Sequence, residues 1–220
     1  MIKSAFPGGP KRPVLRERTW RFFTDEELTE FVATAVNSGT SAIADDIVGG
    51  GLVLSGAATT DDSGANVQLD AFPVKLAAGK SARFLTTLKL SDATQSDLMV
   101  GFGTVDTSII AGSNDFVGFK KTDGSKALQA YYVRDGGTAE TLACGDMADD
   151  TEVTLAFEST MDSAGGGFTA FYVDGVCIGK ITHTTTHLGE NNNAPAIAFQ
   201  SGDATGTKTC TVKTLWFGLD

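Results

Sequence analysis

Residues 151–181, TEVTLAFESTMDSAGGGFTAFYVDGVCIGKI, decide the fold that this sequence predicts. Apolar and polar residues alternate from Val153 to Phe157, the two-residue period of a half-buried strand. A glycine-rich loop follows at residues 165–167, and the alternation resumes at residues 168–173. Asp174-Gly175 then tolerates the positive φ angles that a two-residue hairpin turn needs. The stretch therefore predicts three successive antiparallel strands.

The same period recurs along most of the chain. Of its 220 residues, 41% are hydrophobic, enough for a real core in one all-β domain or in two smaller domains. About a dozen short strands separated by turns predict a sandwich of two antiparallel sheets or a jelly roll. The candidate strands are Leu52–Ser55, Asn66–Asp70, Ala82–Leu90, Leu98–Phe102, Phe116–Lys120, Ala127–Val133, Ala139–Leu142, Glu152–Phe157, Phe168–Val173, Val176–Ile181, Ala196–Gln200 and Thr209–Phe217.

Residues 24–49 are expected to differ from the rest, with an amphipathic helix over residues 24–37 and a connector after it. Thr24 followed by Glu27 has the spacing of a capping box. One apolar face at helical spacing follows, and it would pack either on the sandwich or on an adjacent subunit. This face consists of Leu28, Phe31, Val32, Ala35 and Val36.

Residues 1–23 predict an extended basic arm. They carry six Lys or Arg against one Glu and so contribute +5 to a chain of net charge −10, which leaves −15 on the remainder. Three prolines favour an extended path. The aromatic residues at its end would anchor the arm to its own domain or to a partner. The residues expected to bind a partner are Arg12, Arg16, Arg18, Trp20, Arg21, Phe22 and Phe23.

Three cysteines, Cys144, Cys177 and Cys210, form no disulfide framework. The odd count predicts buried free thiols made in a reducing cytoplasm. The N-terminal residues lack the apolar stretch of a secretory signal. No apolar run reaches the roughly 20 residues that span a bilayer, so no membrane partner is expected.

Several pieces of residues 50–220 resemble concanavalin-A-like jelly rolls, the group that includes laminin-G-like and legume-lectin-like sandwiches. They are the strands Arg83–Leu90 and Leu98–Phe102, the run Phe116–Phe119 before Asp123-Gly124, and Phe171–Val176, which is similar to a recurrent aromatic-valine-Asp-Gly-valine hairpin. The resemblance implies a two-sheet jelly roll. That fold hosts lectins, glycosidases, adhesion modules and viral structural proteins, so it leaves the function open.

The acidic body rich in Gly, Thr and Ala, together with the basic arm, resembles structural proteins of tailed bacteriophages. This resemblance implies a capsid decoration or minor virion protein, made in the host cytoplasm. It would attach to the major capsid protein or another virion protein through its arm and stabilise the particle. A homo-oligomer is expected, a trimer being one option. Nucleic acid is not expected as a partner because a body of charge −15 repels phosphates.

The sequence shows no pattern that spells out a reaction. Glu152 and Glu158 would lie about 20 Å apart on one strand face, too far for paired carboxylate catalysis. His183 and His187 fall at a strand end and in a loop, where their spacing favours no metal. No catalytic residue, enzyme activity or cofactor is therefore expected. Asp-rich loops at residues 61–62, 146–150 and 203 leave Ca²⁺ open.

Two other functions remain as alternatives. The first is a lectin-like, carbohydrate-binding module of a phage tail or surface protein. Its candidate aromatic residues are Tyr131, Tyr132, Tyr172 and Trp216. The second is a glycoside hydrolase, which the missing Glu-x-Asp-x-Glu motif disfavours.

Overall fold

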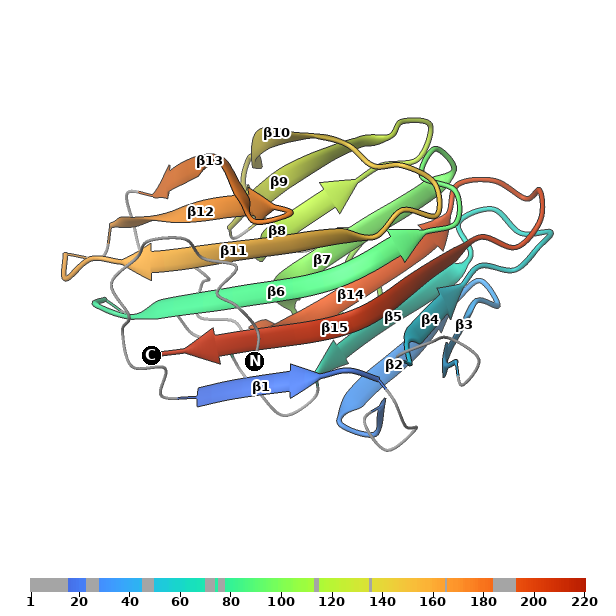
Figure 1. The fold of residues 1–220 in the computed structure, drawn as a ribbon, viewed down its shortest axis with the longest axis horizontal. Coiled ribbons are helices and arrows are strands. Elements are labelled where there is room, and N and C mark those ends of the chain that lie inside the picture. Colours follow the sequence, from blue (N-terminus) through green and yellow to red (C-terminus); the bar gives the residue numbers. More distant parts are fainter. Residues whose placement is uncertain are drawn as a thin grey trace.

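The structure, a computed structural model, describes residues 16–22, 28–44, 50–69, 74, 78–112, 115–134, 136–164, 166–183 and 193–220. Within these residues the chain forms fifteen strands in two antiparallel sheets that pack face to face (Figure 1). The all-β class and the jelly-roll sandwich predicted from the sequence are therefore confirmed.

Sheet A contains eight strands and lies toward the viewer in Figure 1. Its order is β13-β12-β11-β6-β15-β4-β3, and β1 pairs with the second half of β15. The bounds are β1 (Arg16–Trp20), β3 (Thr40–Ile43), β4 (Leu52–Ser55), β6 (Ser81–Leu90), β11 (Val153–Met161), β12 (Gly167–Val173), β13 (Val176–His183) and β15 (Thr209–Leu219).

Sheet B contains seven strands in the order β10-β9-β8-β7-β14-β5-β2. Each consecutive pair runs antiparallel, so alternate side chains of every strand face sheet A. The bounds are β2 (Phe31–Val36), β5 (Gly64–Leu69), β7 (Ser96–Thr104), β8 (Phe116–Lys121), β9 (Ala127–Val133), β10 (Glu140–Asp146) and β14 (Asn193–Ser201).

Phenylalanine rings fill the space between the sheets. Phe84 and Phe157 are neighbours in sheet A, and their rings stack with centroids 5.3 Å apart. Phe102 of sheet B meets the Phe157 ring edge-on, also at 5.3 Å. All three side chains are fully buried. Edge-to-face and stacked pairs of this kind add stability beyond the apolar area that they bury.

The three strands predicted for residues 151–181 are present as β11, β12 and β13. Asp174 and Gly175 have φ angles of 49° and 79°, so the turn between β12 and β13 is of the predicted kind. The pairing of β12 with β13 shifts register between Phe171 and Tyr172. The two-residue period and the Asp-Gly turn were therefore sufficient to locate this part of the fold.

The helix predicted over residues 24–37 is wrong for Phe31–Val36, which form strand β2. The run FVATAV fits both a helical and a two-residue period, and its β-branched residues favour a strand. Pairing with β5 from Phe31↔Leu69 to Val36↔Gly64 decides the outcome. Residues 24–27 lie outside the described residues.

The connector expected after that helix contains strand β3. Asn37 and Ser38, with φ angles of 45° and 68°, turn the chain from β2 in sheet B to β3 in sheet A. A Cβ at Gly39 would lie 2.0 Å from the carbonyl oxygen of Gly64, so the turn approaches β5 too closely for any side chain. This turn connects the two sheets at one side of the sandwich.

The described part of the arm is extended, as predicted, but it lies on the body. Residues 16–20 form β1, which pairs antiparallel with β15 from Arg16↔Leu219 to Trp20↔Leu215. The Trp20 ring stacks on Phe217 at 5.7 Å and is 3% exposed. Phe22 is fully buried and packs near Phe31. These two aromatic side chains therefore anchor residues 16–22 to the core of their own chain.

We expect Phe22→Ala to lower the free energy of unfolding by about 3–5 kcal/mol, because it removes a fully buried ring. Val176→Ala, at a side chain that is 64% exposed, is the control and should change it by about 0.5 kcal/mol or less. Urea denaturation measures both. Equal stability of the two variants would show that residues 16–22 do not dock on this body.

Candidate functional site

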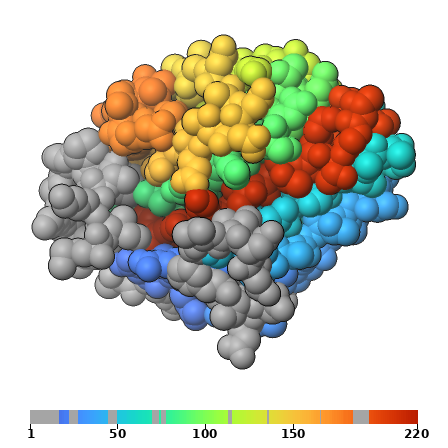
Figure 2. Space-filling view, turned by 45° about the vertical axis from the view of Figure 1, so that its right-hand side comes forward, coloured from blue at the N-terminus to red at the C-terminus, as the bar shows by residue number. Residues whose placement is uncertain are grey.

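A pocket of about 410 Å³ opens at one end of sheet A, where β11 ends, β12 begins and β13 ends. The hairpin of β12 and β13 is the orange segment at the surface in Figure 2. The pocket is therefore built from three neighbouring strands and the turn that joins two of them. It is lined by Thr160, Asp162, Gly166, Gly167, Phe168, Lys180, Thr182 and His183.

Three lining side chains form one row across the three strands. The register pairs Thr160 with Phe168 and Phe168 with Thr182. The Phe168 ring is half-buried, and the Nζ atom of Lys180 lies 4.3 Å from its centroid. Lys180 is exposed and makes no ion pair with any residue that the structure describes. The pocket thus offers an aromatic surface, two hydroxyls and a cation.

The turn after β11 is organised by Asp162. Its Oδ1 atom accepts hydrogen bonds from the N–H groups of Ala164 at 2.8 Å and Gly166 at 3.0 Å. A Cβ on Gly167 would lie 2.0 Å from the carbonyl oxygen of Thr160, so β12 must begin with a glycine to approach β11 this closely. The carboxylate is exposed and adds a hydrogen-bond acceptor to the pocket rim.

His183 joins the pocket to a buried chain of polar side chains. Thr169 Oγ1 lies 2.9 Å from His183 Nε2 and 2.6 Å from Ser159 Oγ. The imidazole also packs on the Tyr132 ring of sheet B, with centroids 4.3 Å apart. Burial lowers the pKa of His183 to about 4, so the imidazole is neutral at pH 7.

This Ser-Thr-His chain resembles a nucleophile relay only in composition. Ser159 is 2% exposed and Thr169 is 1% exposed, so neither hydroxyl can reach a carbonyl group outside the protein. A nucleophile must be accessible to its substrate as well as bonded to a base. We therefore assign a structural role to these three hydrogen-bonded side chains: they hold β11, β12 and β13 together beneath the pocket.

Another cation lies over an aromatic ring on the outer face of sheet B. Lys120 Nζ is 5.0 Å from the centroid of the half-buried Tyr131 ring. Beside Tyr131 in the register lie Gly118 and then Gly101, which add no side chain to this face. The pair has the same chemistry as Lys180 and Phe168, but on the opposite sheet.

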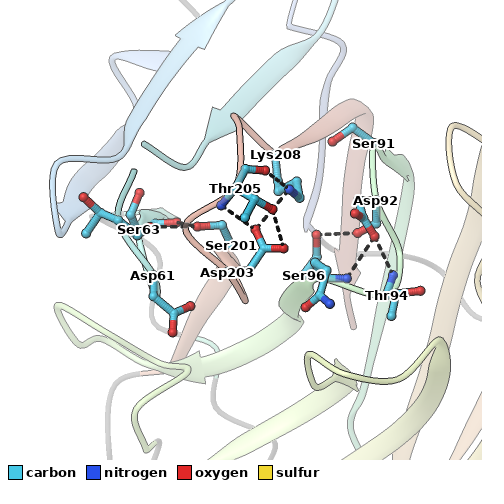
Figure 3. A network of polar contacts seen from close by, with 12 residues as sticks. Asp61, Ser63, Ser91, Asp92, Thr94, Ser96, Ser201, Asp203, Thr205 and Lys208 are labelled. Atoms are coloured by element: carbon cyan, nitrogen blue, oxygen red, sulfur yellow. Dashed lines mark hydrogen bonds and ion pairs between the residues drawn. The ribbon is translucent and has the colours of Figure 1, made fainter. Parts of the chain in front are cut away.

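The Asp-rich loops at the other end of the sandwich use their carboxylates internally (Figure 3). Asp149 accepts the N–H of Ala93 at 2.8 Å, and the neighbouring Asp92, outside the predicted loops, accepts the N–H groups of Thr94 at 3.0 Å and Gln95 at 2.9 Å. Asp203 accepts the N–H of Thr205 at 3.0 Å and pairs with Lys208 at 3.0 Å. In the described part of the chain no group of three or more His, Cys, Asp or Glu residues is arranged to hold a metal ion. Ca²⁺ binding stays an untested expectation.

The residues predicted to bind a partner fall into three groups. Arg12 and Phe23 lie outside the described residues, and so does the side chain of Arg16. Trp20 and Phe22 are buried in the core of this chain, and the Trp20 indole N–H donates to Glu30 at 3.2 Å. Arg18 and Arg21 are exposed, and Arg18 pairs with Glu30 at 3.3 Å. Among the described side chains of this set, those of Arg18 and Arg21 are thus the ones that a partner could reach.

The aromatic residues considered for sugar binding are spread over the molecule. Tyr132 is in the core, whereas Tyr131, Tyr172 and Trp216 are half-buried on outer faces. Burial raises the pKa of Tyr172. The sequence interpretation missed Phe168 and Lys180 as a pair. The Asp-Gly turn predicted the hairpin, but the register shift after Phe171 places Phe168 opposite Thr182 and diagonal to Lys180, so the turn spacing did not mark this pair.

The remaining sequence predictions have mixed outcomes. All three cysteines are free, as predicted, but Cys177 is exposed rather than buried, because it lies on the edge strand β13. Glu158 pairs with Arg83 at 2.9 Å and Glu152 with Lys213, so each carboxylate has a cation partner. His187 lies outside the described residues. Over the described ranges, the chain has no helix with the length and apolar character to cross a bilayer.

Comparisons with known proteins show a shared fold. No protein-family model matches this chain. No curated protein matches its sequence either. Among solved structures, it is similar to an endo-1,3-beta-glucanase from Streptomyces sioyaensis at 12% identity and a TM-score of 0.61, covering 96% of this chain and 99% of the other. These values support the same sandwich architecture over nearly the whole length.

Two more solved structures have comparable likeness. One is the carbohydrate esterase vb_24B_21 from the Shiga toxin-encoding bacteriophage phi24B, at 16% identity and a TM-score of 0.55, covering 94% of this chain and 99% of the other. The other is the carbohydrate recognition domain of Emp46p, at 10% identity and a TM-score of 0.55, covering 87% and 89%.

The expectation that this chain is not an enzyme is contradicted by these comparisons. A glucanase and an esterase share its architecture from end to end. The expectation relied on one missing carboxylate motif, and that motif represents only one of the chemistries that this fold supports. The jelly-roll architecture is shown, and its similar structures include proteins that bind carbohydrates and proteins that act on them.

We expect the free energy of unfolding to decrease as the pH is lowered from 6.5 to 4, and we expect the His183 imidazole to cause part of this decrease. The folded-state pKa is about 4, below the unfolded value of 6.5, so in this window only the unfolded state binds the proton. His183→Gln keeps a hydrogen-bonding group for Thr169 and removes the titration. Urea denaturation across the window should show a steeper loss in the wild type. Parallel curves would contradict the assigned burial of the imidazole.

Proposed function

We propose that this chain is a carbohydrate-binding β-sandwich protein, and that the pocket beside Phe168 and Lys180 receives a sugar unit of a glycan. The observation that carries the proposal is the half-buried Phe168 ring, flanked in one pocket by Lys180 and by the hydroxyls of Thr160 and Thr182. A sugar ring combines C–H groups with many hydroxyls. It therefore needs both an apolar surface and hydrogen-bonding groups around it.

The size and chemistry of the pocket suit such a ligand. Ligand pockets have volumes of about 300–1,000 Å³ and a few polar groups on an otherwise apolar lining. The volume here is about 410 Å³. Lys180 supplies hydrogen-bond donors, Asp162 supplies acceptors, and the threonine hydroxyls supply both. The buried chain from Ser159 to His183 keeps the three strands in place before a ligand arrives.

The similar structures support the same proposal. One is named a carbohydrate recognition domain, and two are named enzymes that act on carbohydrates. Asp162 lies on the pocket rim beside the proposed sugar position, whereas the imidazole of His183 is 4% exposed and packs inward on Tyr132. A carboxylate can transfer protons in enzymes, so cleavage or deacylation of the bound glycan with Asp162 is the second candidate function.

We expect Phe168→Ala and Lys180→Ala each to weaken binding of a glycan by about tenfold or more, because each removes one of the two contacts that define the pocket. The probes are β-glucan, a polyuronate and an acetylated polysaccharide, titrated by calorimetry. Released reducing ends and released acetate are followed in the same samples. Asp162→Asn should abolish any turnover that is found.

Lys120→Ala is the matched control, since it removes a cation over an aromatic ring on the opposite sheet. It should bind as the wild type does. Loss of binding in Lys120→Ala alone would place the site on the outer face of sheet B. Absence of binding to a full glycan array would contradict the proposed function.

A finer proposal concerns the setting of this activity. We propose that the protein is a virion structural protein, of the capsid decoration or tail type, which attaches to a virion lattice through its basic N-terminal residues. The similarity to a bacteriophage protein that covers 94% of this chain favours this setting. Arg18, within β1, and Arg21, directly after it, are exposed and would contact an acidic surface of the major capsid protein or another virion protein.

Deleting residues 1–15 should leave the sandwich folded, because β1, Trp20 and Phe22 are retained. With Arg18→Ala and Arg21→Ala added, the truncated protein should no longer sediment with purified particles, whereas the full chain should do so at a fixed copy number. Circular dichroism and the thermal midpoint check that folding is unchanged. Equal binding of both proteins to particles would rule out attachment through these residues.

A further inference from the structure

One of the two edge strands of sheet B, β2, carries no charge. In the strand order, β2 has β5 as its one neighbour among the described strands, so its other edge is unpaired. Residues 31–44, FVATAVNSGTSAIA, contain no Asp, Glu, Lys, Arg or His, although charged residues make up 20% of the chain. Val32 is 46% exposed, and Ala33 and Ala35 are exposed. The unpaired edge is therefore both accessible and uncharged.

The edges on the opposite side of the sandwich differ from β2. β10 exposes Glu140 and Asp146, and its register shifts after Ala143. β13 exposes Lys180, and its pairing also shifts register. Charges and bulges are the usual devices that keep sheet edges from joining. β2 has neither device, since its pairing with β5 continues without a shift over all six residues.

Between two copies of this chain, contact at the β2 edge costs less than contact at the charged surface. Two molecules of charge −10 repel each other, and contact through charged surface would also desolvate carboxylates. Antiparallel pairing of β2 with itself needs no charge to be buried. It places six uncharged residues against the same six in the partner and satisfies the open backbone groups of both strands.

We propose that β2 is a homodimer interface, in which two copies pair their β2 strands antiparallel about a two-fold axis and extend sheet B from one molecule into the next. A six-residue strand is about 20 Å long. The contact therefore buries less surface area than a stable protein–protein interface, which buries about 1,200–2,000 Å². Dimerisation is therefore concentration-dependent.

Val32→Lys and Val176→Lys provide a matched test, since both replace an exposed valine on an edge strand, one on β2 and one on β13. Sedimentation equilibrium from micromolar to millimolar protein should show a monomer–dimer equilibrium for the wild type and for Val176→Lys. Val32→Lys should associate about tenfold or more weakly, because lysine at a sheet edge opposes pairing. Circular dichroism verifies that both variants are folded.

Hydrogen exchange supplies a second readout. Backbone amides of β2 should exchange more slowly at high protein concentration, and those of β13 should not change. A wild type that stays monomeric at millimolar concentration would overturn the proposal. So would equal association of the two variants, or a trimer, which a two-fold strand pairing cannot form.

Discussion

The packing of aromatic rings between the two sheets is the interaction on which the rest of this structure depends. Phe84, Phe157 and Phe102 meet at the centre, and Phe171 joins them to Phe119 at 5.5 Å across the sandwich. Hydrogen bonds alone would not hold the strands, because water satisfies the same groups in an unfolded chain. Burial of these rings makes one face of each strand turn inward, which leaves residues such as Phe168 and Lys180 on the outside.

The sequence was informative wherever the alternation of apolar and polar residues is clear, even for strands such as β6 and β14 whose partners are distant in the chain. From residue 52 onward, alternation and turn residues located every strand of the described fold, although several ends differ by a few residues. Strands β1 and β2 pair with β15 and β5. Their own residues carry only a weak period. In Phe31–Val36 the helical and strand patterns coincide, and the pairing partner decides between them.

The candidate site was harder to anticipate than the fold. Phe168 and Lys180 are ordinary residues in sequence, and they meet because the hairpin of β12 and β13 places them side by side. No spacing motif marks such a pair, so a search for catalytic motifs missed it. His183 was considered as a metal ligand with His187, yet its contacts are Thr169 and Tyr132, which come from two different sheets. Those contacts depend on the closed sandwich and cannot be derived from local sequence.

The position of β15 has a consequence for how the protein is made. This strand, which ends at Leu219, lies between β6 on one side and β4 and β1 on the other. During synthesis β6, β4 and β1 emerge from the ribosome long before β15. Strand β1 remains without this partner until nearly the entire chain has been synthesised. Sheet A can therefore be completed only after translation has reached the final strand. Pairings this distant in sequence also fold slowly, so the nascent chain exposes unpaired strands for much of its synthesis.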